Sequence, residues 1–290
     1  MEHGGFITAT DATGRADVGF ATATWAEVVR RYAALGIRLR RPVALVIEAM
    51  PIMGATQTTR DGHRLHVAAH ALRSGALDGL MAHEMGHMVR TEQGHPSHRP
   101  EVHRRAVEAV LVPPSQRRAF GGVVRTAINH VEDIYADDLA FQVIRDDDGM
   151  AAFFSDWAQN SAQPGPTRWA TVGQAVTVAF ALGNLARHGI RPEDGVDRRT
   201  EAFARTARLD PLPQFVAVFR DLPRTDETEP VEAAIRDLLS AIASEALRGR
   251  GTRAPPRGAH GAPDPSPRGR NGPSRGGAAC RSPRASSSDP

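Results

Sequence analysis

Two histidines four residues apart, His83 and His87, have the spacing in this sequence that best suits metal chemistry. On an α-helix, side chains four residues apart lie on one face, so both imidazoles can bind a single ion. Glu84 lies beside them and can take a proton from an attacking water and pass it to a leaving group. The pattern predicts a hydrolytic site with one zinc ion per chain and Glu84 as general base.

The residues around this motif indicate a helix. Ser74 is a suitable N-cap, and Asp78 in the first turn favours the positive end of the helix dipole. We therefore expect a helix from about residue 75 to residue 90. The apolar residues on its buried side are Ala76, Leu77, Leu80, Met81, Met85 and Met88.

The segment LMAHEMGHMV, residues 80–89, resembles the active-site helix of zincin metallopeptidases. In that family a glycine often precedes the second histidine and lets the backbones pack closely. The predicted order of strand, edge strand and motif helix is also similar to the zincin half-domain, and the resemblance covers about residues 42–145. It implies a soluble peptidase whose edge strand binds an extended peptide or protein substrate by β-augmentation.

The resemblance also bears on the third ligand. A metzincin would continue as HExxHxxGxxH, but Arg90 and Gln93 stand at the corresponding positions. The sequence is therefore closer to gluzincins, in which a carboxylate arrives from a later helix. His95 and His98 follow the end of the motif helix and are interpreted as loop histidines.

Two neighbouring carboxylates in NHVEDIYADDLA, residues 129–140, compete for that position. Glu132 has the usual gluzincin side chain, and together with Asn129 it resembles the NxxED pattern of some cytosolic HExxH proteins. Asp133 and Asp137 instead match the ExxxD spacing of thermolysin-like enzymes, with Asp in place of Glu. There the second carboxylate orients a ligating histidine through its other ring nitrogen. Glu132 is the preferred ligand and Asp133 the alternative. Asp137 and Asn129 are expected to contact the ligands without binding the metal themselves.

Local patterns predict an α+β fold that is predominantly helical, with a small sheet packed against the motif helix. Residues 42–49 form a nearly continuous apolar run, typical of a buried strand, and residues 63–69 alternate like a half-exposed edge strand. The segment between them, with Pro51, Gly54 and Gly62, is expected to be a loop. Helices are expected at about 25–35, 101–111, 123–145, 167–188, 199–209 and 230–248.

Residues 1–250 are expected to form one domain, in which residues 1–23 are loosely held. Residues 251–290 are rich in Arg, Pro, Gly and Ser and have too few apolar residues to pack, so we expect a disordered tail. All 36 basic residues are arginine, and the tail has a net charge of +5, which leaves −2 for residues 1–250. The domain therefore lacks the basic surface of a nucleic-acid-binding domain, and no nucleic-acid partner is expected for it.

The sequence predicts a cytoplasmic protein without a membrane span. Its first 20 residues have neither the basic nor the apolar region of a signal peptide. Its single cysteine, Cys280, cannot form an intrachain disulfide. Residues 169–185 are apolar but short and contain Gln174 and Asn184, which is typical of a buried helix rather than a bilayer span.

Two function classes remain open beside the peptidase. One is a non-catalytic or regulatory zinc-binding protein that retains a zincin core, and the other is a nucleic-acid or acidic-partner binder acting through the arginine-rich tail. Glu84 favours the peptidase over the first, because a purely structural zinc site needs no general base.

Overall fold

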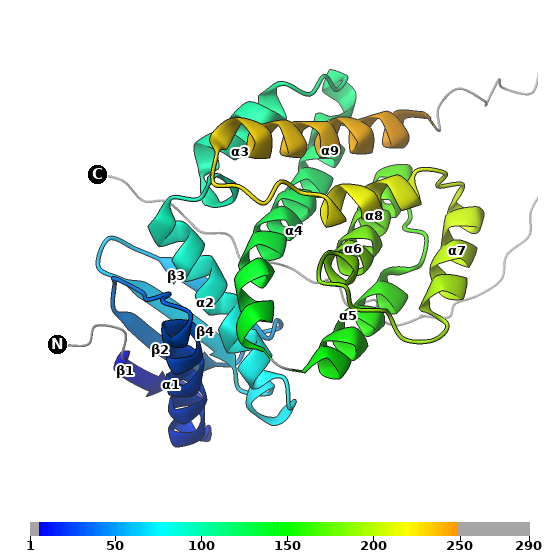
Figure 1. The fold of residues 1–290 in the computed structure, drawn as a ribbon. Helices are drawn as coiled ribbons and strands as arrows, with labels where there is room; N and C mark the ends of the chain where they lie inside the picture. Colours follow the sequence, from blue (N-terminus) through cyan, green and yellow to red (C-terminus); the bar gives the residue numbers. More distant parts are fainter. Residues whose placement is uncertain (1–5, 145, 249–290) are drawn as a thin grey trace, which may run out of the picture. The chain divides into compact units, whose positions relative to one another are not determined.

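The computed structural model describes residues 6–144 and 146–248, and it has an α+β fold that is predominantly helical (Figure 1). A small mixed sheet and two helices come first in the chain, and the remaining residues form a helical assembly. This agrees with the fold class that the sequence predicted. The predicted disordered tail, residues 251–290, lies outside the described residues.

The sheet contains four strands, β1 Phe6–Asp11, β2 Val43–Glu48, β3 Gly54–Thr58 and β4 His63–Ala68, in the order β1-β2-β4-β3. The strands β1, β2 and β4 are parallel, and β3 pairs antiparallel with β4 at the edge. Two sequence predictions were wrong here. The edge strand is β3, in the segment expected to be a loop, and β1 forms within the segment expected to be loose. The short polar sequence of β3 has no alternation that would distinguish it from a loop.

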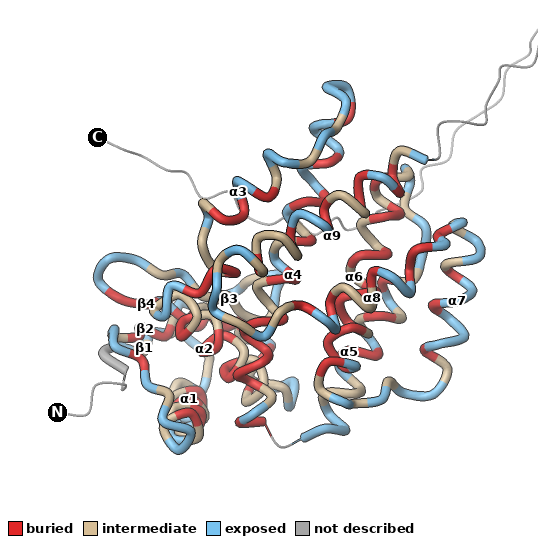
Figure 2. Tube along the Cα trace, turned by 45° about the horizontal axis from the view of Figure 1, so that its top comes forward, coloured by how far each residue is buried: buried red, intermediate tan, exposed pale blue. Residues whose placement is uncertain are grey.

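One face of the sheet is covered by α1, Val18–Ala34, and α2, Leu77–Gln93. Strand β2 alternates between buried and partly exposed residues, so it is not buried on both faces as its apolar run suggested. Figure 2 shows buried positions recurring along α1 with exposed positions between them. The side chains that fill this core include Trp25, Tyr32, Val43, Leu45, Ile47, Leu65, Val67, Met81 and Met85.

The other helices are α3 Pro100–Glu108, α4 Arg117–Val143, α5 Asp147–Ser161, α6 Arg168–Arg187, α7 Val196–Ala207, α8 Leu212–Arg220 and α9 Thr228–Arg248. Five of them match predicted helices, but α5 and α8 were not predicted. The Asp-rich segment before α5 is a helix start, because the Asp146 side chain accepts a hydrogen bond from the Gly149 backbone N–H at 2.9 Å.

Helix α2 begins and ends close to the predicted limits, for partly different reasons. Its N-cap is Ala76 and not Ser74, which instead ends the preceding 3₁₀ turn, Ala71–Arg73. Gly94 ends the helix in the left-handed conformation, with φ of 65°, which glycine adopts without steric cost. The chain then turns into a second 3₁₀ turn, Pro96–His98, which lies beside α2.

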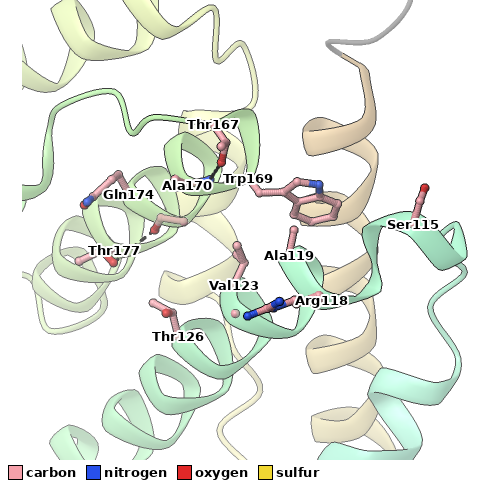
Figure 3. Close-up of a pocket in the computed structure, with 12 residues that line it drawn as sticks. Ser115, Arg118, Ala119, Val123, Thr126, Thr167, Trp169, Ala170, Gln174 and Thr177 are labelled. Carbon is pink, nitrogen blue, oxygen red and sulfur yellow. Dashed lines mark hydrogen bonds between the residues drawn. The ribbon is translucent and has the colours of Figure 1, made fainter. Parts of the chain in front are cut away.

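A groove of about 760 Å³ lies between the N-terminal parts of α4 and α6 (Figure 3). Trp169 and Val123 provide its apolar wall, and Arg118, Thr126 and Gln174 are polar residues along it. The histidines of α2 do not line this groove.

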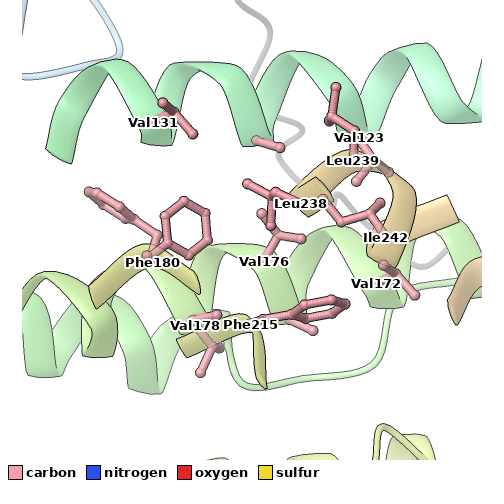
Figure 4. Close-up of a cluster of buried hydrophobic side chains, with 14 of the residues drawn as sticks. Val123, Val131, Val172, Val176, Val178, Phe180, Phe215, Leu238, Leu239 and Ile242 are labelled. Carbon is pink, nitrogen blue, oxygen red and sulfur yellow. The ribbon is translucent and has the colours of Figure 1, made fainter. Parts of the chain in front are cut away.

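Helices α4, α6, α8 and α9 contribute most of the buried residues in the core of the helical assembly (Figure 4). Helix α6 is, within residues 6–144 and 146–248, the one helix long and apolar enough to cross a membrane. However, 67% of its apolar window is buried inside the fold, as in the core helix that the sequence predicted. Labelled residues of this core in Figure 4 include Val131, Val172, Val176, Phe180, Phe215, Leu238 and Ile242.

Helix α4 belongs to both cores and carries the closest helix contact near the motif. Most of its buried residues face the helical core, whereas Leu139, Ala140 and Val143 pack into the core beneath the sheet. Helix α2 crosses α4 at Gly86, where a Cβ atom would lie 2.5 Å from the carbonyl oxygen of Ala136. Because that atom is rigid backbone, only glycine permits this separation of the two helices.

We expect Gly86→Ala to lower the free energy of unfolding by about 1–3 kcal/mol, because the added methyl group must push α2 away from α4. Gly79→Ala in the same helix is the matched control. Its Cβ would lie 3.8 Å from Ile144, an ordinary contact, so the gain in helix propensity should stabilise the protein by about 0.5–1 kcal/mol. Chemical denaturation of both variants measures the difference, and equal stabilities would contradict the close contact.

Candidate metal centre

Three potential metal ligands converge from two helices. His83 and His87 of α2 place their Nε2 atoms 3.0 Å apart. Oδ1 of Asp133, on α4, lies 3.3 Å from Nε2 of His87 and 3.7 Å from Nε2 of His83. These three residues form the ligand triangle, and each offers one donor atom to the same point.

The ligand triangle has dimensions that suit a tetrahedral zinc ion. Four ligands placed tetrahedrally at zinc bond lengths of 2.0–2.2 Å lie roughly 3.3–3.6 Å from one another. The separations of 3.0, 3.3 and 3.7 Å bracket that range. Two imidazole nitrogens and one carboxylate oxygen are also a donor set of catalytic zinc sites, in which the fourth position stays open. The residues present therefore fit the ion.

Asp137 contacts His83 through Nδ1, the ring nitrogen that does not belong to the ligand triangle. The Nδ1–H of His83 donates a hydrogen bond to Oδ1 of Asp137 at 2.6 Å, and the side-chain amide of Asn184, on α6, donates to Oδ2 at 2.6 Å. Desolvation lowers the pKa of His83, but the carboxylates of Asp137 and Asp133 raise it well above 6.5. The bond through Nδ1 directs Nε2 of His83 into the ligand triangle.

Asp133 is held by a histidine that the sequence interpretation did not use. Nδ1 of His130 lies 3.3 Å from Oδ2 of Asp133, and the His130 ring stacks on Phe180 at a centroid distance of 4.2 Å. Desolvation would raise the pKa of Asp133, but the nearby ring nitrogens of His130, His83 and His87 outweigh it and hold the pKa well below 3.8. Asp133 is thus the ionised carboxylate that a metal ion requires.

Glu132, the third ligand that the sequence favoured, does not belong to the ligand triangle. Its Oε1 lies 3.6 Å from Nδ1 of His103. Burial raises the pKa of Glu132 to about 7, to which the Asp133 carboxylate contributes and which His87 opposes. Asn129, expected behind the ligands, is exposed and makes no hydrogen bond to the ligand triangle. The alternative pair, Asp133 and Asp137, is the one that meets the histidines.

Glu84 is buried, at 5% exposure, directly after the ligating position of His83. Within the described part of the chain, its carboxylate makes no hydrogen bond or ion pair. The Thr56 hydroxyl of β3 lies 3.5 Å from the Glu84 carbonyl oxygen, which places the edge strand next to this part of α2. A buried carboxylate without a structural partner is available for proton transfer.

His95 and His98, interpreted as loop histidines, do lie in the loop after α2, but they are connected to the ligand triangle. Nε2 of His98 lies 2.8 Å from Nδ1 of His87, and Nδ1 of His98 lies 2.9 Å from the Ser97 hydroxyl. That hydroxyl lies 2.8 Å from Nδ1 of His95, whose Nε2 lies 3.0 Å from the carbonyl oxygen of Thr225. The spacing of histidines within a Gly-Pro loop is too unspecific a signal to have predicted this.

Comparison with known protein families identifies one match. The model of DUF5781, described as a family of unknown function, matches residues 34–246. No curated protein and no solved structure matches the chain. The matched region contains the ligand triangle and Thr225, so the whole site belongs to the part of the chain that this family shares.

We expect wild-type protein to bind one zinc ion and Asp133→Asn to weaken that binding by more than about 100-fold, because a ligand and its charge are lost. Glu132→Gln is the matched control on the neighbouring residue and should bind zinc about as tightly as wild type. His87→Ala should lose most of its metal. Competition with a chromophoric chelator measures all three affinities.

The opposite ranking would contradict the geometry. If Glu132→Gln loses zinc while Asp133→Asn retains it, Glu132 is the third ligand that the sequence favoured. If His87→Ala keeps stoichiometric zinc, the ion binds elsewhere.

Proposed function

We propose that this chain, which belongs to the DUF5781 family, is a zinc-dependent hydrolase that cleaves peptide bonds. The observation that carries the proposal is the convergence of two histidine nitrogens and one carboxylate oxygen beside a buried glutamate without a structural partner. His83, His87 and Asp133 would hold the ion. A zinc ion bound there would act as a Lewis acid on the scissile carbonyl and lower the pKa of the attacking water.

Glu84 is suited to the role of general base. It immediately follows His83 on α2, so it lies at the edge of the ligand triangle, and no other residue in the described part of the chain engages its carboxylate. A carboxylate in this position can accept a proton from the attacking water and return it to the leaving amine. A purely structural metal site would leave Glu84 without any role, which favours the enzyme over the non-catalytic alternative.

Asp137 and His130 keep the ligands in the geometry that binding requires. Asp137 orients the His83 ring, and Asn184 in turn holds the second oxygen of Asp137. His130 donates to the Asp133 oxygen that faces away from the histidines. Hydrogen-bond partners of this kind make the ligands more basic. They also restrict the side-chain rotation of the ligands before the ion binds, so less conformational entropy is lost on binding.

The edge strand supports a peptide as the substrate. Within residues 6–144 and 146–248, strand β3 pairs only with β4, so the backbone groups on its other side can pair with an extended peptide. Thr56 of this strand approaches the Glu84 carbonyl oxygen, so a peptide added beside β3 would run close to α2. An antiparallel edge strand followed by a helix with HExxH, and a carboxylate from a later helix, also supports the resemblance to zincins.

Tyr135 and His103 lie on helices next to the ligand triangle and could donate a hydrogen bond to an oxyanion, but both are already engaged. The Tyr135 hydroxyl donates to the carbonyl oxygen of Pro223 at 2.8 Å. Nε2 of His103 donates to the carbonyl oxygen of Ser97 at 2.7 Å. Both donors are therefore used to hold the loops around the ligand triangle, and neither N–H nor O–H is directed at a substrate.

We expect Glu84→Gln to leave zinc content and thermal stability close to wild type but to slow peptide hydrolysis by at least about 100-fold. The substitution preserves size and removes only the ability to accept a proton. Initial rates on a broad peptide library, with zinc measured on the same samples, test this. Glu108→Gln, an exposed position on α3, is the control and should be as active as wild type.

Two results would contradict the proposal. Equal rates for Glu84→Gln and wild type would show that the hydrolysis does not come from this motif. Stoichiometric zinc without cleavage of any peptide in the library would favour the non-catalytic zinc-binding protein.

A further inference from the structure

We infer that His98, Ser97 and His95 form a positioning chain that fixes the tautomer of His87, so that its Nε2 lone pair faces the metal position. This inference rests on the proposed zinc site and adds to it three residues outside the ligand triangle. It follows from the donor and acceptor in each of four consecutive hydrogen bonds. These can be assigned one after another, starting at His95, where the acceptor is a backbone carbonyl oxygen and the donor is therefore unambiguous.

That end is His95. Its Nε2 lies 3.0 Å from the carbonyl oxygen of Thr225, and a carbonyl oxygen can only accept, so Nε2 carries a hydrogen. The backbone N–H of Ser97 donates to Nδ1 of His95 at 3.2 Å, so Nδ1 carries none. His95 is therefore neutral with one defined tautomer. Burial, which lowers its pKa to about 4, agrees with this assignment.

The Ser97 hydroxyl has one hydrogen to donate. Because Nδ1 of His95 is an acceptor, the hydroxyl must donate to it across their 2.8 Å contact. The same oxygen lies 2.9 Å from Nδ1 of His98 and can only accept there, so Nδ1 of His98 carries a hydrogen. Ser97 is fully buried, which leaves the hydroxyl no water with which to exchange these partners.

His98 is the acceptor for His87. Within the described part of the chain, His98 makes no ion pair with a carboxylate that would favour a second ring hydrogen, and its ring nitrogens contact Ser97 and His87. With Nδ1 protonated, its Nε2 has a lone pair and accepts the hydrogen bond from Nδ1–H of His87 at 2.8 Å.

The result is that both histidines of α2 direct an Nδ1–H away from the ligand triangle. Asp137 takes the Nδ1–H of His83, and His98 takes the Nδ1–H of His87. Both Nε2 atoms are then available to bind an ion at the metal position, beside Asp133 Oδ1. A neutral imidazole without such partners populates both tautomers, and one of them has a hydrogen where the metal must bind.

The chain ends at a segment distant in the sequence. Thr225 lies between α8 and α9, 130 residues after His95. Tyr135 holds this segment in place, because its hydroxyl donates to the Pro223 carbonyl oxygen and its ring lies 4.6 Å from that of His95. The loop after α2 is thus fixed between the ligand triangle and the helical core.

The test compares variants that break the chain with variants that preserve its last bond. Ser97→Ala removes the relay, and His98→Leu removes the acceptor. His98→Gln retains an acceptor oxygen at the position of Nε2 and should rescue the function. Ser155→Ala is the matched control, because Ser155 is also fully buried and its hydroxyl accepts a backbone hydrogen bond, from Glu193, in a different part of the fold.

Two quantities are measured on full-length protein. The first is the nitrogen-15 chemical shifts of the His87 ring in metal-free protein, which report which ring nitrogen carries the hydrogen. The second is zinc affinity by chelator competition. We expect wild type, His98→Gln and Ser155→Ala to protonate Nδ1 and to bind zinc similarly. Ser97→Ala and His98→Leu should show mixed tautomers and bind zinc about 10- to 100-fold more weakly.

The inference is overturned if the tautomer of His87 is unchanged in Ser97→Ala and His98→Leu, or if it changes while zinc affinity does not. It is also overturned if Ser155→Ala weakens zinc binding as much as Ser97→Ala, since the effect would then be loss of stability. Failure of the proposed function has a different signature. Wild type would then bind no zinc, or would bind zinc and cleave no peptide, and the ring shifts of the metal-free protein would still decide the tautomer.

Discussion

The contact between α2 and α4 at Gly86 is the constraint on which the rest of the site depends. The two helices run in opposite directions there, since His83 meets Asp137 whereas His87, one turn later, lies near Asp133, one turn earlier. Each helix thus presents a pair of residues four apart, and the two pairs face each other across the point where Gly86 touches Ala136. A side chain at residue 86 would have to push the two helices apart at this point, because its Cβ would lie 2.5 Å from the Ala136 carbonyl oxygen, and the distances between the pairs would increase.

The charges placed at this contact explain why so many polar groups surround it. Asp137 is almost fully buried, and a buried carboxylate is stable only when hydrogen bonds or opposite charges replace its water. His83 of α2 and Asn184 of α6 provide such bonds to Asp137, and His130 of α4 provides one to Asp133. The helical part of the protein therefore does more than support the motif helix, because Asn184 and His130 hydrogen-bond to the two aspartates and orient them.

The position of α4 in both hydrophobic cores gives the site its rigidity. The N-terminal part of this helix is held by α6 and α9, and its C-terminal part packs into the core of the sheet. Asp133 and Asp137 lie where these two regions meet, so neither can shift without disturbing tightly packed side chains. The loop after α2 is fixed in the same way, between His87 and the segment before α9.

The sequence by itself determined the features that depend on local periodicity and spacing. These are the helix with His83, Glu84 and His87, the strands β2 and β4, and most of the later helices, because neighbouring residues alone decide which side chains share a face. Sequence reasoning did not find β1, β3, α5 or α8. The residues of β3 are small and polar, and pairing with β4 rather than intrinsic preference makes them a strand.

Only the tertiary structure decided which carboxylate meets the histidines and what His95 and His98 do. Glu132 and Asp133 are adjacent on one helix and point about 100° apart, so the rotation of α4 against α2 selects between them. That rotation is set by packing along the whole length of α4, which no local pattern encodes. Likewise, the bond from His95 to Thr225 joins residues 130 positions apart, and only the folded chain brings them together.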